Sequence, residues 1–168
     1  RGYDLGFITH YIIEEKLKPL YWYEIEGEVL HNSEEFGGID ANLDVDFCIK
    51  LESKKEIKDK KFTPKVLAYD IETDELKIGE GEILMVSLVS ENFKKVITWK
   101  DKQTKLDYVE YVKDEAELLE KFVEYVKEVS PDFLVGYFSD GFDLPYLKAR
   151  ADANKIKLSL GLDESQPK

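Results

Sequence analysis

The sequence predicts an α/β fold in which helices pack on a mixed sheet, and three patterns carry that prediction. Residues 65–73 form a stretch that is apolar on both faces until Asp70, which is typical of a strand buried on two sides. Two further apolar strands, 83–90 and 94–99, follow it as an antiparallel meander. A helix, a short strand and a second helix then complete an order that fits helices packed on a mixed sheet.

The residues before this sheet predict a small α+β piece. Residues 4–17 have the spacing of an amphipathic helix, with Asp4 in the position of its cap. Aromatic residues at 21–23 lead into a strand that turns at Gly27, and residues 43–52 alternate as a strand with one solvated face does. The apolar stripe of the helix consists of Phe7, Ile8, Tyr11 and Ile12.

A charged segment at 53–61 predicts an exposed linker between two domains. Pro64 then begins the next unit, because proline is rarely found inside a continuous strand. We therefore expect two domains, over residues 1–60 and 61–168.

The second half of the sheet region contains clear helix signals. Asp114 and Glu117 have the spacing of a capping box, ahead of a helix that ends at Ser130-Pro131. Residues 132–138 form another short apolar strand, and Pro145 falls in the first turn of a last helix, where proline is tolerated. The apolar face of the first helix consists of Leu118, Leu119, Phe122, Val123, Val126 and Val129.

Composition bounds the function. The chain has 168 residues, of which 43% are hydrophobic, and this content is ample for a core. No apolar run approaches the ~20 residues needed to span a bilayer, and the first residues lack a signal-peptide pattern and an initiator Met, so we expect a cytoplasmic piece of a longer chain with no membrane partner. The net charge of −12 disfavours unaided nucleic-acid binding unless metal ions or neighbouring domains supply positive charge. A single cysteine, Cys48, excludes an internal disulfide.

Two carboxylates, Asp70 and Glu72, share one face at the end of the strand over residues 65–73. Ionised carboxylates so close together in a poorly solvated place repel each other, and a divalent cation would compensate them. The simpler interpretation is a strand-end turn, because 36 residues of this chain are acidic. The pattern leaves both interpretations open.

A third carboxylate, Asp143, stands just before Pro145 and could serve only as the N-cap of the last helix. If the strand over 132–138 lies beside the strand over 65–73, however, Asp143 faces Asp70 and Glu72. Three carboxylates that meet at strand ends would form a two-metal site for hydrolysis of a phosphodiester.

Two motifs carry a resemblance to a known family. Val66-Leu67-Ala68-Tyr69-Asp70-Ile71-Glu72-Thr73 resembles the first 3′–5′ exonuclease motif of archaeal family B DNA polymerases, and Tyr137-Phe138-Ser139-Asp140-Gly141-Phe142-Asp143-Leu144-Pro145-Tyr146-Leu147 resembles the second. Residues 96–100 and 156–161 are similar to the same enzymes.

The resemblance implies a ribonuclease-H-like 3′–5′ exonuclease fold that removes mispaired nucleotides from a primer's 3′ end. It implies Mg²⁺ or Mn²⁺ held by Asp70, Glu72 and Asp143 as catalytic residues. It also implies that Phe142 packs against or wedges the terminal bases. Tyr137 and Phe138 would contact the substrate with it.

Residues before about 60 resemble the end of the N-terminal domain of the same polymerases. Phe7 stands where that domain has an aromatic wall of a uracil pocket, although a proline usual just before it is Gly6 here. The implied partners are DNA, the remaining polymerase domains and a sliding clamp.

Two departures from the family pattern leave alternatives. The second motif normally has Asn at the position of Phe138, and the third motif, a Tyr followed four positions later by Asp, does not occur in these residues. We therefore expect the 168 residues alone to be weakly active or inert. Phe138 favours a degenerate module that only guides DNA or a replication partner; an exonuclease acting on RNA is a third possibility, against which the N-terminal segment argues.

Overall fold

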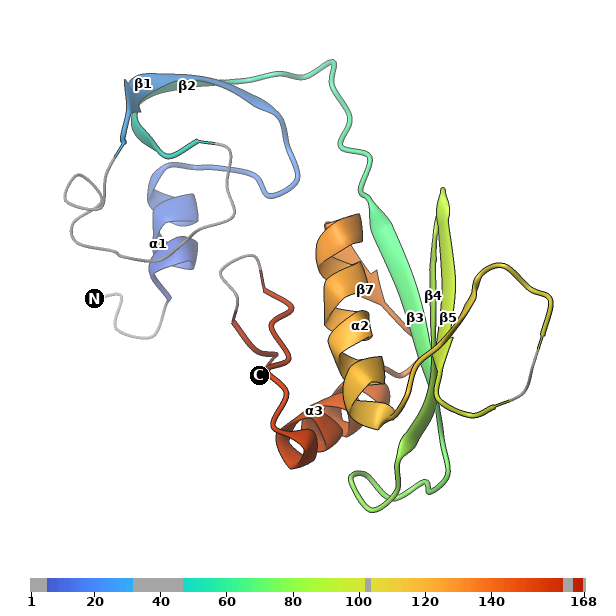
Figure 1. Cartoon of the computed structure of the whole chain (residues 1–168). Helices are drawn as coiled ribbons and strands as arrows, with labels where there is room; N and C mark the ends of the chain where they lie inside the picture. Colours follow the sequence, from blue (N-terminus) through green and yellow to red (C-terminus); the bar gives the residue numbers. More distant parts are fainter. Residues whose placement is uncertain (1–5, 32–46, 102–103, 162–164, 168) are drawn as a thin grey trace. The chain divides into compact units, whose positions relative to one another are not determined.

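The computed structural model describes residues 6–31, 47–101, 104–161 and 165–167 (Figure 1). The described residues divide into two compact units, one formed by residues 6–31 and 47–63 and the other by those from Pro64 onward. We call them the first and the second unit. The division falls between Thr63 and Pro64, shortly after the predicted boundary at residue 60.

The first unit contains helix α1 (Phe7–Glu14) and an antiparallel pair of strands, β1 (Tyr23–Val29) and β2 (Ile49–Glu56). The sequence predicted a turn at Gly27. Instead, the strand continues through this residue and shifts its register between Glu26 and Gly27. A side chain at Gly27 would overlap the carbonyl oxygen of Lys50 on the partner strand. Glycine is required there because the two backbones approach too closely for a Cβ.

Several predicted bounds in the first unit were wrong. The helix predicted over 4–17 is shorter, and its proposed cap Asp4 lies outside the described residues, as do residues 43–46 of the predicted strand. The segment predicted as linker, 53–61, begins inside β2. Its charged side chains are accommodated because β2 pairs with β1, whose charged residues are all glutamates, and Lys55 of β2 lies opposite Glu24 of β1.

The second unit is built on a five-stranded sheet in the order β6-β5-β4-β3-β7. Its strands are β3 (Val66–Thr73), β4 (Ile83–Ser90), β5 (Phe93–Thr98), β6 (Val109–Tyr111) and β7 (Phe133–Val135). The predicted meander of β3, β4 and β5 is confirmed. β7 runs parallel to β3 and β6 parallel to β5, so the sheet is mixed, as predicted.

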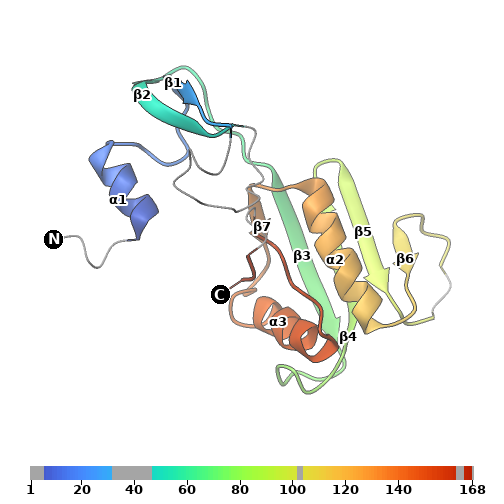
Figure 2. The ribbon, with the colours of Figure 1, turned by 60° about the vertical axis from the view of Figure 1, so that its left-hand side comes forward.

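Helices α2 (Glu115–Val129) and α3 (Asp143–Asn154) lie on the same face of this sheet (Figures 1 and 2). The inward face of β3 packs under them, and the rings of Tyr69 and Phe122 lie 5.8 Å apart between β3 and α2. The core of the unit consists of Leu67, Tyr69, Ile71, Ile83, Val86, Leu88, Ile97, Leu118, Leu119, Phe122, Tyr125, Val126, Val129, Tyr146, Leu147, Ala151 and Leu158.

The prediction that β3 is buried on both faces was wrong. Val66, Ala68, Asp70 and Glu72 are exposed, whereas the alternate residues of the strand are buried. Both helices lie on the other face of the sheet and leave Val66 and Ala68 exposed. Single exposed apolar side chains are common on protein surfaces.

Helix α2 begins and ends as its sequence indicates. The Asp114 side chain accepts a hydrogen bond of 2.9 Å from the backbone N–H of Glu117, which confirms the predicted N-cap. The helix ends at Val129, and its C-cap, Ser130, has a left-handed φ of 44°. None of the helices in the described part of the chain is long and apolar enough to cross a bilayer.

Candidate active site

The candidate site lies where β3 continues beyond its parallel neighbour. β7 pairs only with residues 66–68 of β3 and ends at Val135, so the strand predicted over 132–138 is shorter than expected. The following turn runs close beside β3, because a Cβ on Gly136 would lie 3.0 Å from the carbonyl oxygen of Tyr69 and 2.9 Å from Cβ of Ser139. This turn delivers the start of α3 to the free edge of β3.

Asp143 is the first residue of α3 and is only 3% exposed. Burial raises the pKa of its carboxyl group and the charge of Asp70 raises it further, while the backbone N–H groups of Asp143 and Ile71 that donate to it act in the opposite direction. The N-cap position belongs to Phe142, which makes no side-chain cap bond. Asp143 therefore connects α3 to β3 and does not serve only as a helix cap.

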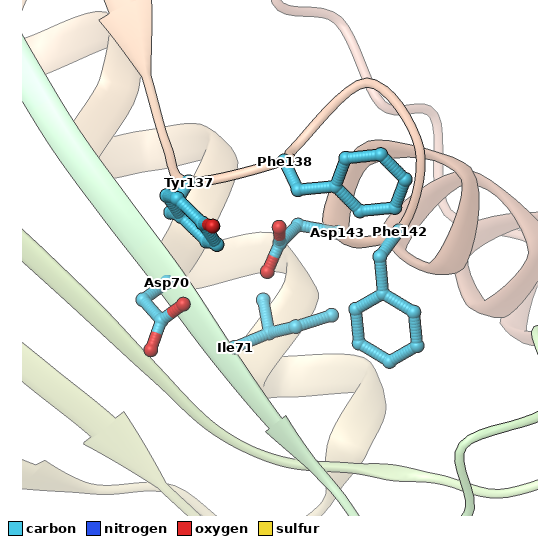
Figure 3. A pocket seen from close by; sticks show the side chains of 6 residues that line it. All are labelled: Asp70, Ile71, Tyr137, Phe138, Phe142 and Asp143. Atoms are coloured by element: carbon cyan, nitrogen blue, oxygen red, sulfur yellow. The ribbon is translucent and has the colours of Figure 1, made fainter.

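A cavity of about 630 Å³ opens at this place and is lined by Asp70, Ile71, Tyr137, Phe138, Phe142 and Asp143. In Figure 3 the Asp143 carboxylate lies in the middle of these side chains, with Asp70 and Tyr137 on one side and Phe138 and Phe142 on the other. Two carboxylates from different elements thus meet three aromatic rings in one pocket.

The structure does not bring Glu72 into this lining. Glu72 shares the exposed face of β3 with Asp70 but lies two residues further along, beside the register shift between Glu72 and Thr73. Among the described residues, no three histidine, cysteine, aspartate or glutamate side chains are grouped so that they could hold a metal ion. The pocket therefore presents a pair of carboxylates.

The aromatic residues of the pocket differ in how they are held. Tyr137 is 95% exposed and Phe138 is 71% exposed, whereas the ring of Phe142 packs at 5.5 Å from that of Tyr146. Phe138 has a left-handed backbone with φ of 55°, a region that a bulky residue seldom occupies.

A buried tyrosine beneath the turn was not singled out from the sequence. Burial raises the pKa of Tyr69, and the charges of Asp143 and Asp140 act in the same direction, whereas the Ser139 side chain in the turn lowers it. The alternation of β3 indicates that Tyr69 faces inward, but only the fold brings its hydroxyl to the turn.

Sequence reasoning also missed the contacts that hold α3 in place. Glu115, 4% exposed at the start of α2, accepts hydrogen bonds from Nε and Nη2 of Arg150 at 2.8 and 2.6 Å. Its carboxylate also accepts from the side chain of Asn154 and from the backbone N–H of Ile83, both at 2.8 Å. In a chain with 36 acidic residues, no local signal distinguishes this buried one.

A second anchor of α3 is Tyr146, one turn after Asp143. Its hydroxyl donates to the carbonyl oxygen of Glu75 at 3.1 Å and accepts from the N–H of Gly81 at 3.2 Å. The loop between β3 and β4 is thereby tied to the same helix that carries Asp143.

The comparisons with known proteins agree with this fold. The solved structure of the family B DNA polymerase from the hyperthermophilic archaeon Pyrobaculum calidifontis matches 98% of this chain and 20% of its own with a TM-score of 0.73. At 22% identity this likeness shows the fold, and it confirms the predicted ribonuclease-H-like α/β architecture.

Related sequences and a family model also connect this chain with DNA polymerases. A DNA polymerase of Pyrococcus glycovorans is 45% identical over 107 residues, 62% of this chain and 14% of the relative. DNA polymerase 1 of Pyrococcus abyssi is 41% identical over 126 residues, 69% of this chain and 16% of the relative. The chain thus spans less than a fifth of either relative's length. The model of the family B DNA polymerase exonuclease domain matches residues 1–165, and the chain belongs to that family.

Proposed function

We propose that the second unit is a proofreading 3′–5′ exonuclease of a family B DNA polymerase, which hydrolyses 3′-terminal nucleotides from DNA. The observation that carries this proposal is the pocket in which Asp70, from β3, and Asp143, from α3, meet three aromatic rings. Carboxylates bind the catalytic cations of phosphodiester hydrolysis, and aromatic rings contact bases without regard to sequence.

The donor set of this pocket suits hard divalent cations such as Mg²⁺ or Mn²⁺, because both prefer carboxylate oxygens. Asp70 and Asp143 would hold them, and Glu72, on the same face of β3 as Asp70, completes the proposed set. Two bound cations would activate a water molecule and stabilise the leaving oxygen. Asp143 is buried at the start of α3, and Asp70 remains open to an entering strand.

The proposal extends to the rest of the chain by the same family membership. Residues 1–60 would be the end of the polymerase N-terminal domain and residues 61–168 the exonuclease domain. DNA, the remaining polymerase domains and a sliding clamp would be its partners. With only two carboxylates in the pocket lining, the 168 residues alone should bind cations weakly and act slowly.

The test is digestion of a 5′-labelled single-stranded DNA by excess protein in Mn²⁺, with stepwise shortening followed on a gel. We expect slow loss of 3′ nucleotides that is abolished by Asp70→Ala and by Asp143→Asn. Asp152→Asn, which removes an exposed charge from the same helix outside the pocket, serves as the matched control and should digest like the unchanged chain. Digestion that survives Asp70→Ala would refute the proposal.

Phe138 favours a second candidate, a module that binds or guides DNA without cutting it. An aromatic ring there removes the polar contact implied by the family pattern. Phe138→Asn distinguishes the two candidates, because digestion that appears only in this variant would identify Phe138 as the cause of inactivity. Binding of DNA without digestion by any variant would support the binding module.

A further inference from the structure

The ring of Phe138 is seated on Gly141. A Cβ at Gly141 would overlap the ring carbons Cζ, Cε1 and Cε2 of Phe138, and these are the three atoms nearest to it. Gly141 does not have a positive φ, so its backbone alone would accept alanine. The absence of a side chain at 141 therefore makes room for the Phe138 ring and is not required by the turn itself.

The backbone conformation of Phe138 that positions this ring is energetically unfavourable. A left-handed φ of 55° is unfavourable for a phenylalanine, and such strain is concentrated at functional sites in proteins. Burial does not offset it, because the side chain is largely exposed. The turn is closed by backbone hydrogen bonds from the N–H groups of Gly141 and Phe142 to the carbonyl oxygen of Phe138, so the conformation is built into the turn.

The surroundings indicate what the open side of the ring could contact. Phe138 lines the same cavity as Asp70 and Asp143. Tyr137, whose side chain is almost fully exposed, lines it on the other side of the Asp143 carboxylate (Figure 3). A volume of about 630 Å³ is within the range of pockets for small ligands and leaves room for a nucleotide. A ligand that has both an aromatic base and a phosphate would suit this pocket. The base can stack on a flat ring, and cations held by the carboxylates can bind the phosphate.

We propose that the Phe138 ring, seated on Gly141, is a preformed stacking platform for the terminal base of a single DNA strand. This inference rests on the proposed function, since it requires a DNA 3′ end in the pocket. Recognition by stacking does not depend on the base, because every base has a π face. At residue 138 the platform replaces the hydrogen-bonding side chain of the family pattern. The site should therefore distinguish a nucleotide that has a base from an abasic one, but not one base from another.

The test measures, in the presence of Ca²⁺, binding of a short single-stranded DNA that ends in 2-aminopurine at its 3′ terminus. The fluorescence of 2-aminopurine is quenched when this base stacks. A second oligonucleotide ends in an abasic nucleotide. We expect the unchanged chain to quench the 2-aminopurine and to bind the abasic oligonucleotide more weakly. Phe138→Ala should abolish most of the quenching and weaken binding of the base-ended DNA roughly 5- to 100-fold, with little effect on the abasic one.

Gly141→Ala provides the decisive variant, because its methyl group displaces the ring without removing it. It should weaken binding as Phe138→Ala does, and it should have no further effect when Phe138 is already alanine. Phe138→Tyr, which retains a ring, should bind the base-ended DNA as the unchanged chain does. Phe133→Ala, which removes an exposed phenylalanine of β7 outside the pocket, is the matched control.

Two results would overturn the platform. One is equal binding of the base-ended DNA by the unchanged chain and Phe138→Ala. The other is a loss from Gly141→Ala that persists in the Phe138→Ala background, since the ring would then not be its cause. Digestion that requires Asp70 but is insensitive to Phe138→Ala would refute the platform alone, whereas a chain that neither binds nor digests DNA would refute the proposed function with it.

Discussion

Glu115→Gln is expected to destabilise the second unit by about 3 kcal/mol. Removing one partner of a buried ion pair costs roughly 3–5 kcal/mol, because the other charge stays buried without compensation. Arg150 is the partner left behind, and its side chain is 16% exposed, so some water still reaches it. Glutamine keeps one oxygen that can accept from the N–H of Ile83, and for both reasons we expect the lower end of the range.

The effect should depend on pH in a defined direction. Burial alone would raise the pKa of Glu115, but hydrogen bonds from Arg150, Ile83 and Asn154 and the charge of Arg150 outweigh it and hold the pKa below its usual value. A carboxyl group whose pKa is lowered by folding stabilises the folded state above its unfolded pKa of about 4.3. The difference between Glu115 and Glu115→Gln should therefore be constant near neutral pH and shrink as the pH falls through the lowered folded-state pKa.

The assay is urea unfolding followed by the fluorescence of Trp99. Trp99 donates from Nε1 to the carbonyl oxygen of Ile83 at 2.8 Å and so reports on the second unit. Trp22→Phe removes the other tryptophan, which lies in the first unit. A loss of about 3 kcal/mol lowers the midpoint by roughly 1–2 M urea if the slope is about 1.5–3 kcal/mol per M.

The control for this prediction is Glu120→Gln, which removes an exposed charge from the same helix and should change the stability by less than about 0.5 kcal/mol. A loss below about 1 kcal/mol for Glu115→Gln would contradict the buried ion pair. An undiminished loss at a pH where the carboxyl group is protonated would contradict the electrostatic explanation.

Three further substitutions test other contacts of the second unit. Tyr146→Phe removes the hydroxyl that joins Glu75 and Gly81 and should lower the free energy of unfolding by about 1–3 kcal/mol; an unchanged urea midpoint would contradict these bonds. Ser130→Gly relieves a left-handed φ of 44° and should raise the melting temperature by an amount corresponding to roughly 0.5–1 kcal/mol, whereas Ser130→Ala should give no gain. Asp114→Ala removes the N-cap of α2 and should cost about 0.5–2 kcal/mol, most of which Asp114→Ser should recover in the same thermal unfolding measurement.

The elements with strong local patterns could be predicted from the sequence. β3, β4 and β5 follow from runs of apolar residues, and α2 follows from its capping residue and apolar face. β6 was missed because three residues are too few to show a period. β7 was predicted too long, because the apolar residues that extend it, Tyr137 and Phe138, are exposed in the turn instead.

The candidate site shows the same division between local and distant information. Asp70, Glu72 and Asp143 could be proposed from their motifs, since a strand end and a helix start are local features of the chain. Their arrangement depends on how far β7 pairs with β3. Because β7 ends at Val135, the turn after it brings Asp143 into the same pocket as Asp70. No local pattern contains that information, because it arises between strands far apart in the sequence.

What the sequence by itself determined about this protein is the order of its main elements, its family and the carboxylates that its motifs offer. The tertiary structure alone decided that both helices cover one face of the sheet, that Glu115 and Arg150 form a buried pair 35 positions apart, and that the Phe138 ring rests on Gly141. The physical reason is that periodicity and capping act within a few residues, whereas burial, ion pairing and close approach depend on which surfaces the folded chain brings together.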